Sequence, residues 1–181
     1  MGQPEVSRNL KGNSRVYEWL KKNKRFVLIS RAILAVIHPE QYETGLKILN
    51  CIEEEPMCLR EPEYVQTMLD AWCSLFSGCA IIANCETPCH RDVGSRHEWY
   101  DVICTMGSYG TTMAWIPGLT AGFNYHAGMA IALCGQILAH KVDMHEDRHQ
   151  VCFAWFMRDN IQEYIGISPG KGSQGEVLLM G

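Results

Sequence analysis

The chain has 181 residues, of which 47% are hydrophobic and 20% are charged. This length suits one domain with one core and excludes two catalytic lobes, while the composition excludes a disordered chain and a collagen-like fibre. No uncharged run of 18 apolar residues occurs, and the N-terminus lacks the apolar centre of a signal peptide, so we expect a soluble protein that is not secreted.

The net charge of -4 is unevenly distributed along the chain. Residues 1–31 contain eight Lys and Arg against two acids, a charge of +6, and the remaining 150 residues contain eight bases against eighteen acids, a charge of -10. A basic arm on an acidic body is typical of proteins with an anionic partner such as nucleic acid, although a solvated helix face gives the same count. Both interpretations stay open.

Nine cysteines, an odd number, are scattered through the chain without a CxxC pair. Their surroundings are mostly apolar or strand-like, which favours buried thiols over a disulfide framework. We therefore expect a reducing compartment, with most of these cysteines acting as small core residues.

The first third of the chain is predicted to be helical. Residues 14–37 place basic and apolar residues at helical spacing. A second helix is expected to begin at Pro39, since proline is favoured in a first turn, and its apolar stripe continues to Ile52. A third, short helix is expected after Pro62.

The rest of the chain is predicted to form strands, because short apolar segments are separated by turns that contain glycine and proline. The expected strands are residues 79–84, 99–105, 112–117, 129–133, 137–142 and 148–157. The tail from Ile167 is expected to be a loop or a frayed end.

This order of elements predicts the α+β class, with N-terminal helices packed on one sheet of a two-sheet β body. We expect a single domain over residues 1–181. Its first part, residues 1–77, is expected to be mainly helical, and residues 78–160 are expected to form the β core.

A candidate metal site begins with the triplet His90-Arg91-Asp92. On an extended segment, residues i and i+2 point to the same face, so His90 and Asp92 can approach one ion. His140 lies on a later predicted strand and supplies a distant histidine. Two histidines and one carboxylate occupy one face of an octahedral ion and leave three positions open, as expected for non-haem Fe(II) oxygenases.

Two alternatives compete with this interpretation. A histidine beside an aspartate is common on protein surfaces. A zinc site that uses Cys85, Cys89 and His90 is the other alternative, but no CxxC or second cysteine pair completes a set of four ligands.

Arg148 is the predicted partner of a co-substrate. An open iron site needs an electron-donating co-substrate, most often 2-oxoglutarate, whose far carboxylate favours a bidentate arginine. If residues 143–147 form a hairpin turn, His140 and Arg148 stand opposite each other on paired strands and share a face. Arg158, at the far end of the same strand, is the alternative.

The order and spacing of these motifs resemble those of TET/JBP-type 2-oxoglutarate and Fe(II)-dependent dioxygenases, above all the compact fungal members. The resemblance covers residues 30–160, and its motifs are residues 84–92, Tyr100-Asp101, residues 122–128, residues 135–142 and Arg148. It implies a double-stranded β-helix (jelly-roll) core, Fe(II) on His90, Asp92 and His140, and 2-oxoglutarate on Arg148. The implied reaction is stepwise oxidation of the methyl group of 5-methylcytosine in DNA to 5-hydroxymethylcytosine or beyond.

The resemblance also points to residues around the ligands. Ser95, Tyr100 and Asp101 are expected to contact the substrate. Asn84 is expected either to bind the cofactor or a base edge through its amide or to cap a turn.

The partners implied by this reaction are molecular oxygen and DNA whose methylated base is flipped from the duplex, with the basic arm on its phosphates and a nuclear location. No membrane is implied. Two other functions are weighed beside this one: the same cofactor chemistry on N6-methyladenine, RNA or a small molecule, and a catalytically inactive nucleic-acid-binding module of the same fold.

Overall fold

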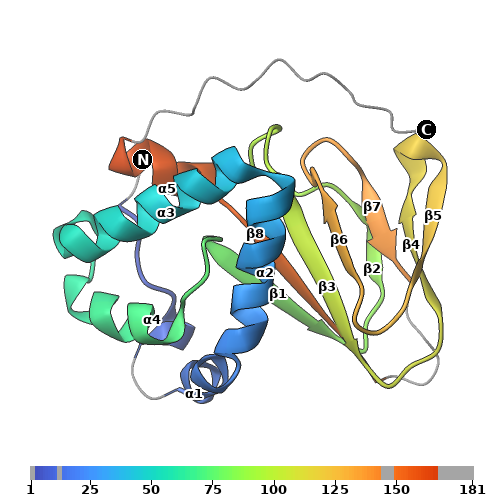
Figure 1. Ribbon diagram of the computed structural model, residues 1–181, viewed down its shortest axis with the longest axis horizontal. Coiled ribbons are helices and arrows are strands. Elements are labelled where there is room, and N and C mark those ends of the chain that lie inside the picture. The colour runs from blue at the N-terminus through green and yellow to red at the C-terminus, as the bar shows by residue number, and fades with distance from the viewer. Residues whose placement is uncertain (1–2, 12–13, 144–148, 167–181) are drawn as a thin grey trace.

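A computed structural model describes residues 3–11, 14–143 and 149–166 of the chain (Figure 1). The α-helices are α1 (Arg15–Lys22), α2 (Lys24–Ile37), α3 (Pro39–Glu54), α4 (Val65–Ala71) and α5 (Asp159–Ile165), and the short 3-10 helices are η1 (Arg8–Leu10), η2 (Pro56–Cys58), η3 (Pro62–Tyr64) and η4 (Pro117–Leu119). The strands are β1 (Gly78–Ala83), β2 (Thr87–His90), β3 (Asp101–Gly107), β4 (Thr112–Ile116), β5 (Ala121–Tyr125), β6 (Ala130–Leu133), β7 (His140–Val142) and β8 (Gln150–Phe156).

The single helix predicted over residues 14–37 is wrong in one respect, because the chain breaks it into α1 and α2 at Asn23. The Asn23 side chain donates to the carbonyl of Trp19 at 2.7 Å, and so ends α1. The helix expected at Pro39 is confirmed as α3. His38 caps it, since its Nδ1 accepts the Gln41 N–H at 3.2 Å.

The strands form two four-stranded antiparallel sheets, in the orders β1-β8-β3-β6 and β2-β7-β4-β5. Strands that follow one another in the sequence therefore often lie in opposite sheets, as in a jelly roll wound as a double-stranded β-helix. Figure 1 shows the helices covering the β1-β8-β3-β6 sheet. The predicted α+β class, with helices packed on one sheet of such a core, is confirmed.

The hairpin predicted between the last two strands is wrong. β7 pairs with β2 and β4, whereas β8 pairs with β1 and β3 in the other sheet. β7 and β8 therefore lie in different sheets. Strands that alternate between two sheets in this way let both sheets bury one apolar face against each other. The pairing used to place Arg148 opposite His140 therefore does not form. β2 and β5 lie outside the predicted strands, and α5 follows β8.

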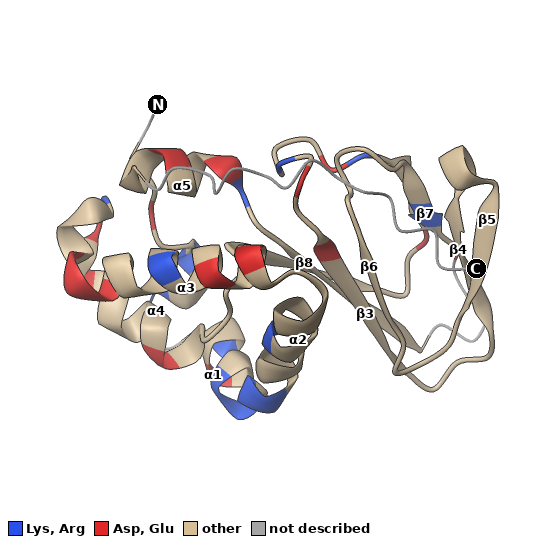
Figure 2. Ribbon diagram, turned by 45° about the horizontal axis from the view of Figure 1, so that its top comes forward, with Lys and Arg blue, Asp and Glu red and all other residues tan. Residues whose placement is uncertain are grey.

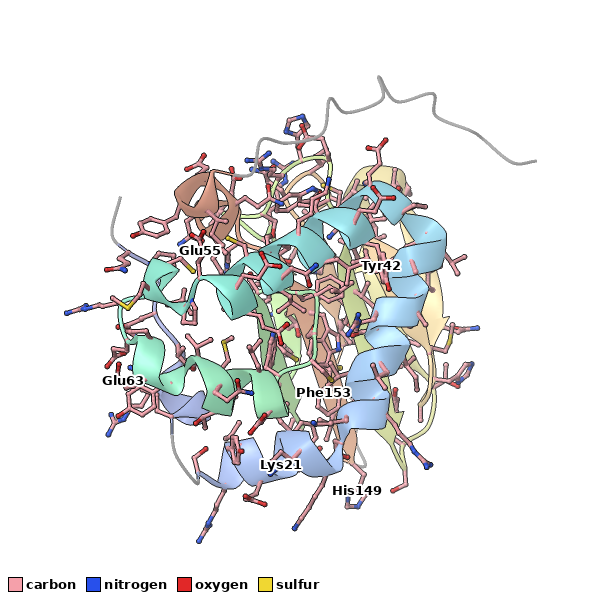
Figure 3. The ribbon with its side chains drawn as sticks, turned by 60° about the vertical axis from the view of Figure 1, so that its left-hand side comes forward. Lys21, Tyr42, Glu55, Glu63, His149 and Phe153 are labelled. Atoms are coloured by element: carbon pink, nitrogen blue, oxygen red, sulfur yellow. The ribbon has the colours of Figure 1, made fainter. Side chains whose placement is uncertain are left out.

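Two apolar cores lie on the two faces of the β1-β8-β3-β6 sheet. The helices cover the outer face, where Phe26 meets Phe153 edge-on at 4.6 Å and Trp155 is fully buried. Figure 3 shows Phe153 beneath the helical layer. The second core lies between the two sheets and contains Tyr125, which is also fully buried and donates its hydroxyl to the Ile103 carbonyl at 3.1 Å.

The cysteines are all free thiols, and several occupy these cores as expected. Burial raises the pKa of Cys79 to about 12 and that of Cys104 to about 11, so both thiols stay protonated at neutral pH. Cys85 and Cys89 are exposed instead. In the part of the chain that the structure describes, no helix has both the length and the apolar character needed to cross a membrane.

Candidate metal centre

His90 and His140 lie side by side at the end of the β2–β7 pair. The two residues are direct cross-strand partners, and their ring centroids are 4.5 Å apart. The side chain of His140 is 6% exposed, whereas that of His90 is 37% exposed. His140 thus lies on the buried side of the site, and His90 lies on its solvent-exposed side.

Asp92 completes a cluster of three possible ligands. Its two carboxylate oxygens lie 3.6 Å from His90 Nε2 and 3.6 Å from His140 Nε2. β2 ends at His90, so no ladder partner fixes Asp92; its N–H instead donates to the Gly135 carbonyl at 2.9 Å. This bond holds the carboxylate at the face where both imidazoles end.

The two imidazoles are oriented so that Nε2 faces the carboxylate. His90 Nδ1 lies 2.8 Å from the Pro88 carbonyl, and His140 Nδ1 lies 3.1 Å from the Leu138 carbonyl. A carbonyl only accepts hydrogen bonds, so each Nδ1 must carry a proton. In the neutral ring, Nε2 then keeps a free lone pair directed at the cluster, which is how metal-binding histidines are usually held.

This donor set fits a divalent iron ion. Two ligands bound at right angles, each about 2.1 Å from one ion, stand about 3 Å apart, close to the observed separations. One carboxylate and two imidazoles match the ligands expected for Fe(II). Within the described residues, these three form the one group of His, Cys, Asp or Glu close enough to hold an ion, so the cysteine-containing zinc alternative has no supporting cluster there.

Gly135 and Asp101 form the wall behind Asp92. A Cβ on Gly135 would lie 2.5 Å from an oxygen of Asp92 and 2.5 Å from an oxygen of Asp101, so only glycine fits between them. The predicted substrate residue Ser95 donates to Asp101 Oδ1 at 3.4 Å, and both side chains are buried. Gly135 begins the sequence motif of residues 135–142, and nothing in its spacing indicates its contacts with Asp92 and Asp101.

Burial and the neighbouring Asp92 carboxylate raise the pKa of Asp101 to about 7, against the opposing effects of Ser95, Arg158 and the Gly135 N–H. Its Oδ2 has no hydrogen-bond partner within the described residues.

Tyr100 and Asn84, the other residues predicted to act in the site, lie in different places. The backbone of Tyr100 is held by the buried Gln41 side chain of α3, with bonds of 2.9 Å to its N–H and its carbonyl. Asn84 lies in a turn with a φ of 54°, and its side-chain oxygen accepts the Gln150 N–H at 3.1 Å. The conformation and the hydrogen bond of Asn84 are those of a turn-capping residue.

The two arginines considered for 2-oxoglutarate are Arg148 and Arg158. Arg148 lies outside the described residues. Arg158 lies close to the metal cluster, because its guanidinium donates to the Val93 carbonyl at 2.8 Å and packs over the Phe156 ring at 4.5 Å. Its charge also acts on Asp101. The sequence places Arg158 just beyond the C-terminal end of β8, far from Arg148. In the fold, this end of β8 lies near the metal cluster.

One family model matches most of this chain. The family model Tet_JBP, described as the oxygenase domain of the 2OGFeDO superfamily, matches residues 8–159. No curated protein gives a significant match. Among solved structures, the chain is similar to a Cupin 2 conserved barrel domain protein from Salinispora arenicola CNS-205, at 19% identity and a TM-score of 0.33. The match covers 49% of this chain and 66% of that protein, which is just under two thirds of its length. The family match spans most of the sequence and includes all three clustered residues, so this chain belongs to the Tet/JBP family of 2-oxoglutarate and Fe(II)-dependent oxygenases.

Proposed function

We propose that this protein is a dioxygenase that uses Fe(II), 2-oxoglutarate and O2 to oxidise the methyl group of 5-methylcytosine in DNA. The observation that carries the enzymatic part is the convergence of His90, Asp92 and His140 in a chain of this oxygenase family. When bound, iron and 2-oxoglutarate supply the activation of O2 that oxidation of an unactivated C–H bond requires. The intact ligand set argues against an inactive module.

The residues of this chain have distinct roles in the proposed reaction. His90, Asp92 and His140 hold the ion, and the carbonyls of Pro88 and Leu138 keep both Nε2 atoms turned towards it. We assign the far carboxylate of 2-oxoglutarate to Arg148. Ser95, Tyr100 and Asp101 are proposed to lie along the path of the substrate. Asn84 is assigned the role of capping its turn, because its side-chain oxygen accepts the Gln150 N–H.

The proposed DNA contact is a basic cluster at the junction of α1 and α2, formed by Lys21, Lys22, Lys24 and Arg25. All four side chains are exposed, and Figure 2 shows the blue Lys and Arg positions gathered there. The 14 residues of α2 separate this junction from His38, which contacts the Glu98 carbonyl near the site. At about 1.5 Å per residue the separation is roughly 20 Å, close to the width of a duplex. We propose that this cluster contacts phosphates of the bound DNA, and a nuclear location is the corresponding proposal.

The test is direct analysis of the product. The iron-loaded protein is incubated with 2-oxoglutarate and duplex oligonucleotides that carry one 5-methylcytosine or one N6-methyladenine, and the nucleosides are then analysed by mass spectrometry. We expect 5-hydroxymethylcytosine, formed with an equal amount of succinate. Oxidation confined to N6-methyladenine, or succinate formation without any oxidised base, would contradict the proposed substrate.

A further inference from the structure

One short turn supports two of the three candidate metal ligands. The 134–138 turn lies between β6 and β7. The carbonyl of Gly135, near its start, accepts the N–H of Asp92 at 2.9 Å. The carbonyl of Leu138, at its end, lies 3.1 Å from His140 Nδ1. A shift of this turn would therefore move the carboxylate and one imidazole of the site together.

The turn is closed on itself and tied down at its first residue. The Leu138 N–H donates to the Cys134 carbonyl at 2.9 Å, so the backbone folds back within five residues. The buried Cys134 thiol donates to the His97 carbonyl at 3.0 Å. These two bonds fix the start of the turn. The next residue, Gly135, is held by a different group.

Asp101 is the group that packs against Gly135. It is the first residue of β3, and its partner on β6 is Leu133, two residues before Gly135. A Cβ on Gly135 would lie 2.5 Å from Asp101 Oδ2, so the carboxylate lies directly against the backbone of the turn. The N–H of Gly135 stabilises the charged form of this carboxylate. On its other side, Asp101 accepts a hydrogen bond from the Ser95 hydroxyl at 3.4 Å.

A carboxylate is an unfavourable residue to bury in this place. Asp101 is 2% exposed, and burial disfavours an acid whose hydrogen bonding is incomplete. Asp92 lies close to the same point of Gly135, so the two carboxylates also repel each other. Packing alone would favour an apolar side chain at this position. Residues that break a rule of this kind are typically found at functional sites.

We propose that Asp101 is a positioning residue of the metal centre: it holds the 134–138 turn by accepting a hydrogen bond, and the turn places Asp92 and His140 for the ion. Asp101 is not one of the three described residues whose ligand atoms converge, so it acts through Gly135. This role is additional to the place along the substrate path that is proposed for Asp101 above. The inference rests on the proposed metal centre and does not depend on which base is oxidised.

Three variants test the role of the Asp101 side chain. Asp101→Asn keeps an oxygen that accepts a hydrogen bond and removes the charge, whereas Asp101→Leu removes both at a similar size. Asp70→Leu makes the same change at an exposed position on α4 and serves as the control. If Asp101→Leu does not fold, Asp101→Ala takes its place.

The first measurement is a titration with Co(II) alone, followed by the visible absorption of the bound ion, which reports its coordination. We expect Asp101→Leu to weaken Co(II) binding by about 10- to 100-fold and to alter the spectrum, as losses around metal ligands typically do. Asp101→Asn should stay within about threefold of the wild type and keep its spectrum, as should the control. Equal losses in Asp101→Asn and Asp101→Leu would show that the charge matters and not the hydrogen bond, and would overturn the proposal.

The second measurement needs no metal. Amide hydrogen exchange of the metal-free protein follows the Asp92 N–H, which donates to Gly135. We expect Asp101→Leu to speed its exchange about tenfold or more by loosening the turn locally, and Asp101→Asn and Asp70→Leu to leave it unchanged. Exchange in β8 reports the stability of the whole fold and should be equal in all four proteins.

The two measurements separate this inference from the proposed metal centre. If the wild type binds no Co(II) at the cluster, the metal centre fails, and the exchange of Asp92 alone decides whether Asp101 holds the turn. If the wild type binds Co(II) and Asp101→Leu binds it equally well, the metal centre stands and the role of Asp101 is wrong. Equal exchange of the Asp92 N–H in the wild type and in Asp101→Leu also overturns the inference.

Discussion

His90 on β2 and His140 on β7 are direct cross-strand partners whose ring centroids lie 4.5 Å apart. The two residues are far apart in the sequence, so the metal centre exists only when these strands have paired. A ligand set that is assembled by folding couples metal binding to folding. This relationship leads to the first prediction.

A divalent metal is expected to raise the thermal unfolding midpoint of the wild-type chain. An ion that binds only the folded state at about 100 times its dissociation constant stabilises the fold by about 2.7 kcal/mol. The measurement is a melting curve with and without Zn(II) as the redox-inert ion. Asp92→Ala should show no such increase, and an equal increase in both proteins would place the bound metal elsewhere.

Gly135→Ala is expected to weaken Fe(II) binding by about 10- to 100-fold, as losses around metal ligands typically do. The added Cβ would lie 2.5 Å from a carboxylate oxygen of Asp92, which must then move. The measurement is an anaerobic Fe(II) titration of folded protein. Gly118→Ala is the matched control, because a Cβ there meets nothing within 4 Å. Equal affinities in the two variants would show that the Gly135 contact does not position Asp92.

Arg148→Ala is expected to raise the 2-oxoglutarate concentration required for half-maximal turnover far more than Arg158→Ala does. Losing a buried bidentate contact to a carboxylate costs about 2 to 5 kcal/mol, whereas Arg158 already donates to the Val93 carbonyl. Metal binding should survive Arg148→Ala. The position of Arg158 beside the cluster makes it the strongest competitor, and a larger effect from Arg158→Ala would transfer the role to it.

Neutralising Lys21, Lys22, Lys24 and Arg25 together is expected to weaken DNA binding and to reduce the slope of log affinity against log salt by roughly 3 to 4 units, since each phosphate contact contributes about 0.9. Oxidation of a free nucleoside, if it is a substrate, should not change. Lys47→Gln, an exposed basic position on α3, serves as the control. An unchanged slope in the quadruple variant would remove the basic cluster from the DNA-binding surface.

The convergence of the metal cluster could be predicted from sequence because it depends on few local features. The i, i+2 spacing of His90 and Asp92 brings two ligands to one face, and His140 stands at the start of a strand that pairs with β2 in the same sheet. The helix at Pro39 was likewise predictable from a proline in the first turn. Each of these predictions requires only local geometry or one strand pair.

The surroundings of the cluster could not be predicted, because they depend on which sheet each strand joins. A polar turn after β7 is typical of a hairpin, yet β8 pairs in the opposite sheet. Because β8 pairs with β1 and β3 in that sheet, Arg158, which follows β8, lies near the metal ligands. Gly135 contacts Asp92 and Asp101, and these three residues come from separate segments of the chain. The spacing of residues in the sequence therefore could not predict these contacts.

The central claim is that His90, Asp92 and His140 form the iron centre of a 2-oxoglutarate-dependent oxygenase, and its most direct test is 2-oxoglutarate decarboxylation by His140→Ala. The control is His126→Ala, which removes an exposed histidine outside the cluster. With Fe(II), O2 and the methylated oligonucleotide, we predict that the wild type and the control release succinate at similar rates and that His140→Ala releases none above background. Full 2-oxoglutarate decarboxylation by a correctly folded His140→Ala protein would contradict the assignment of the site.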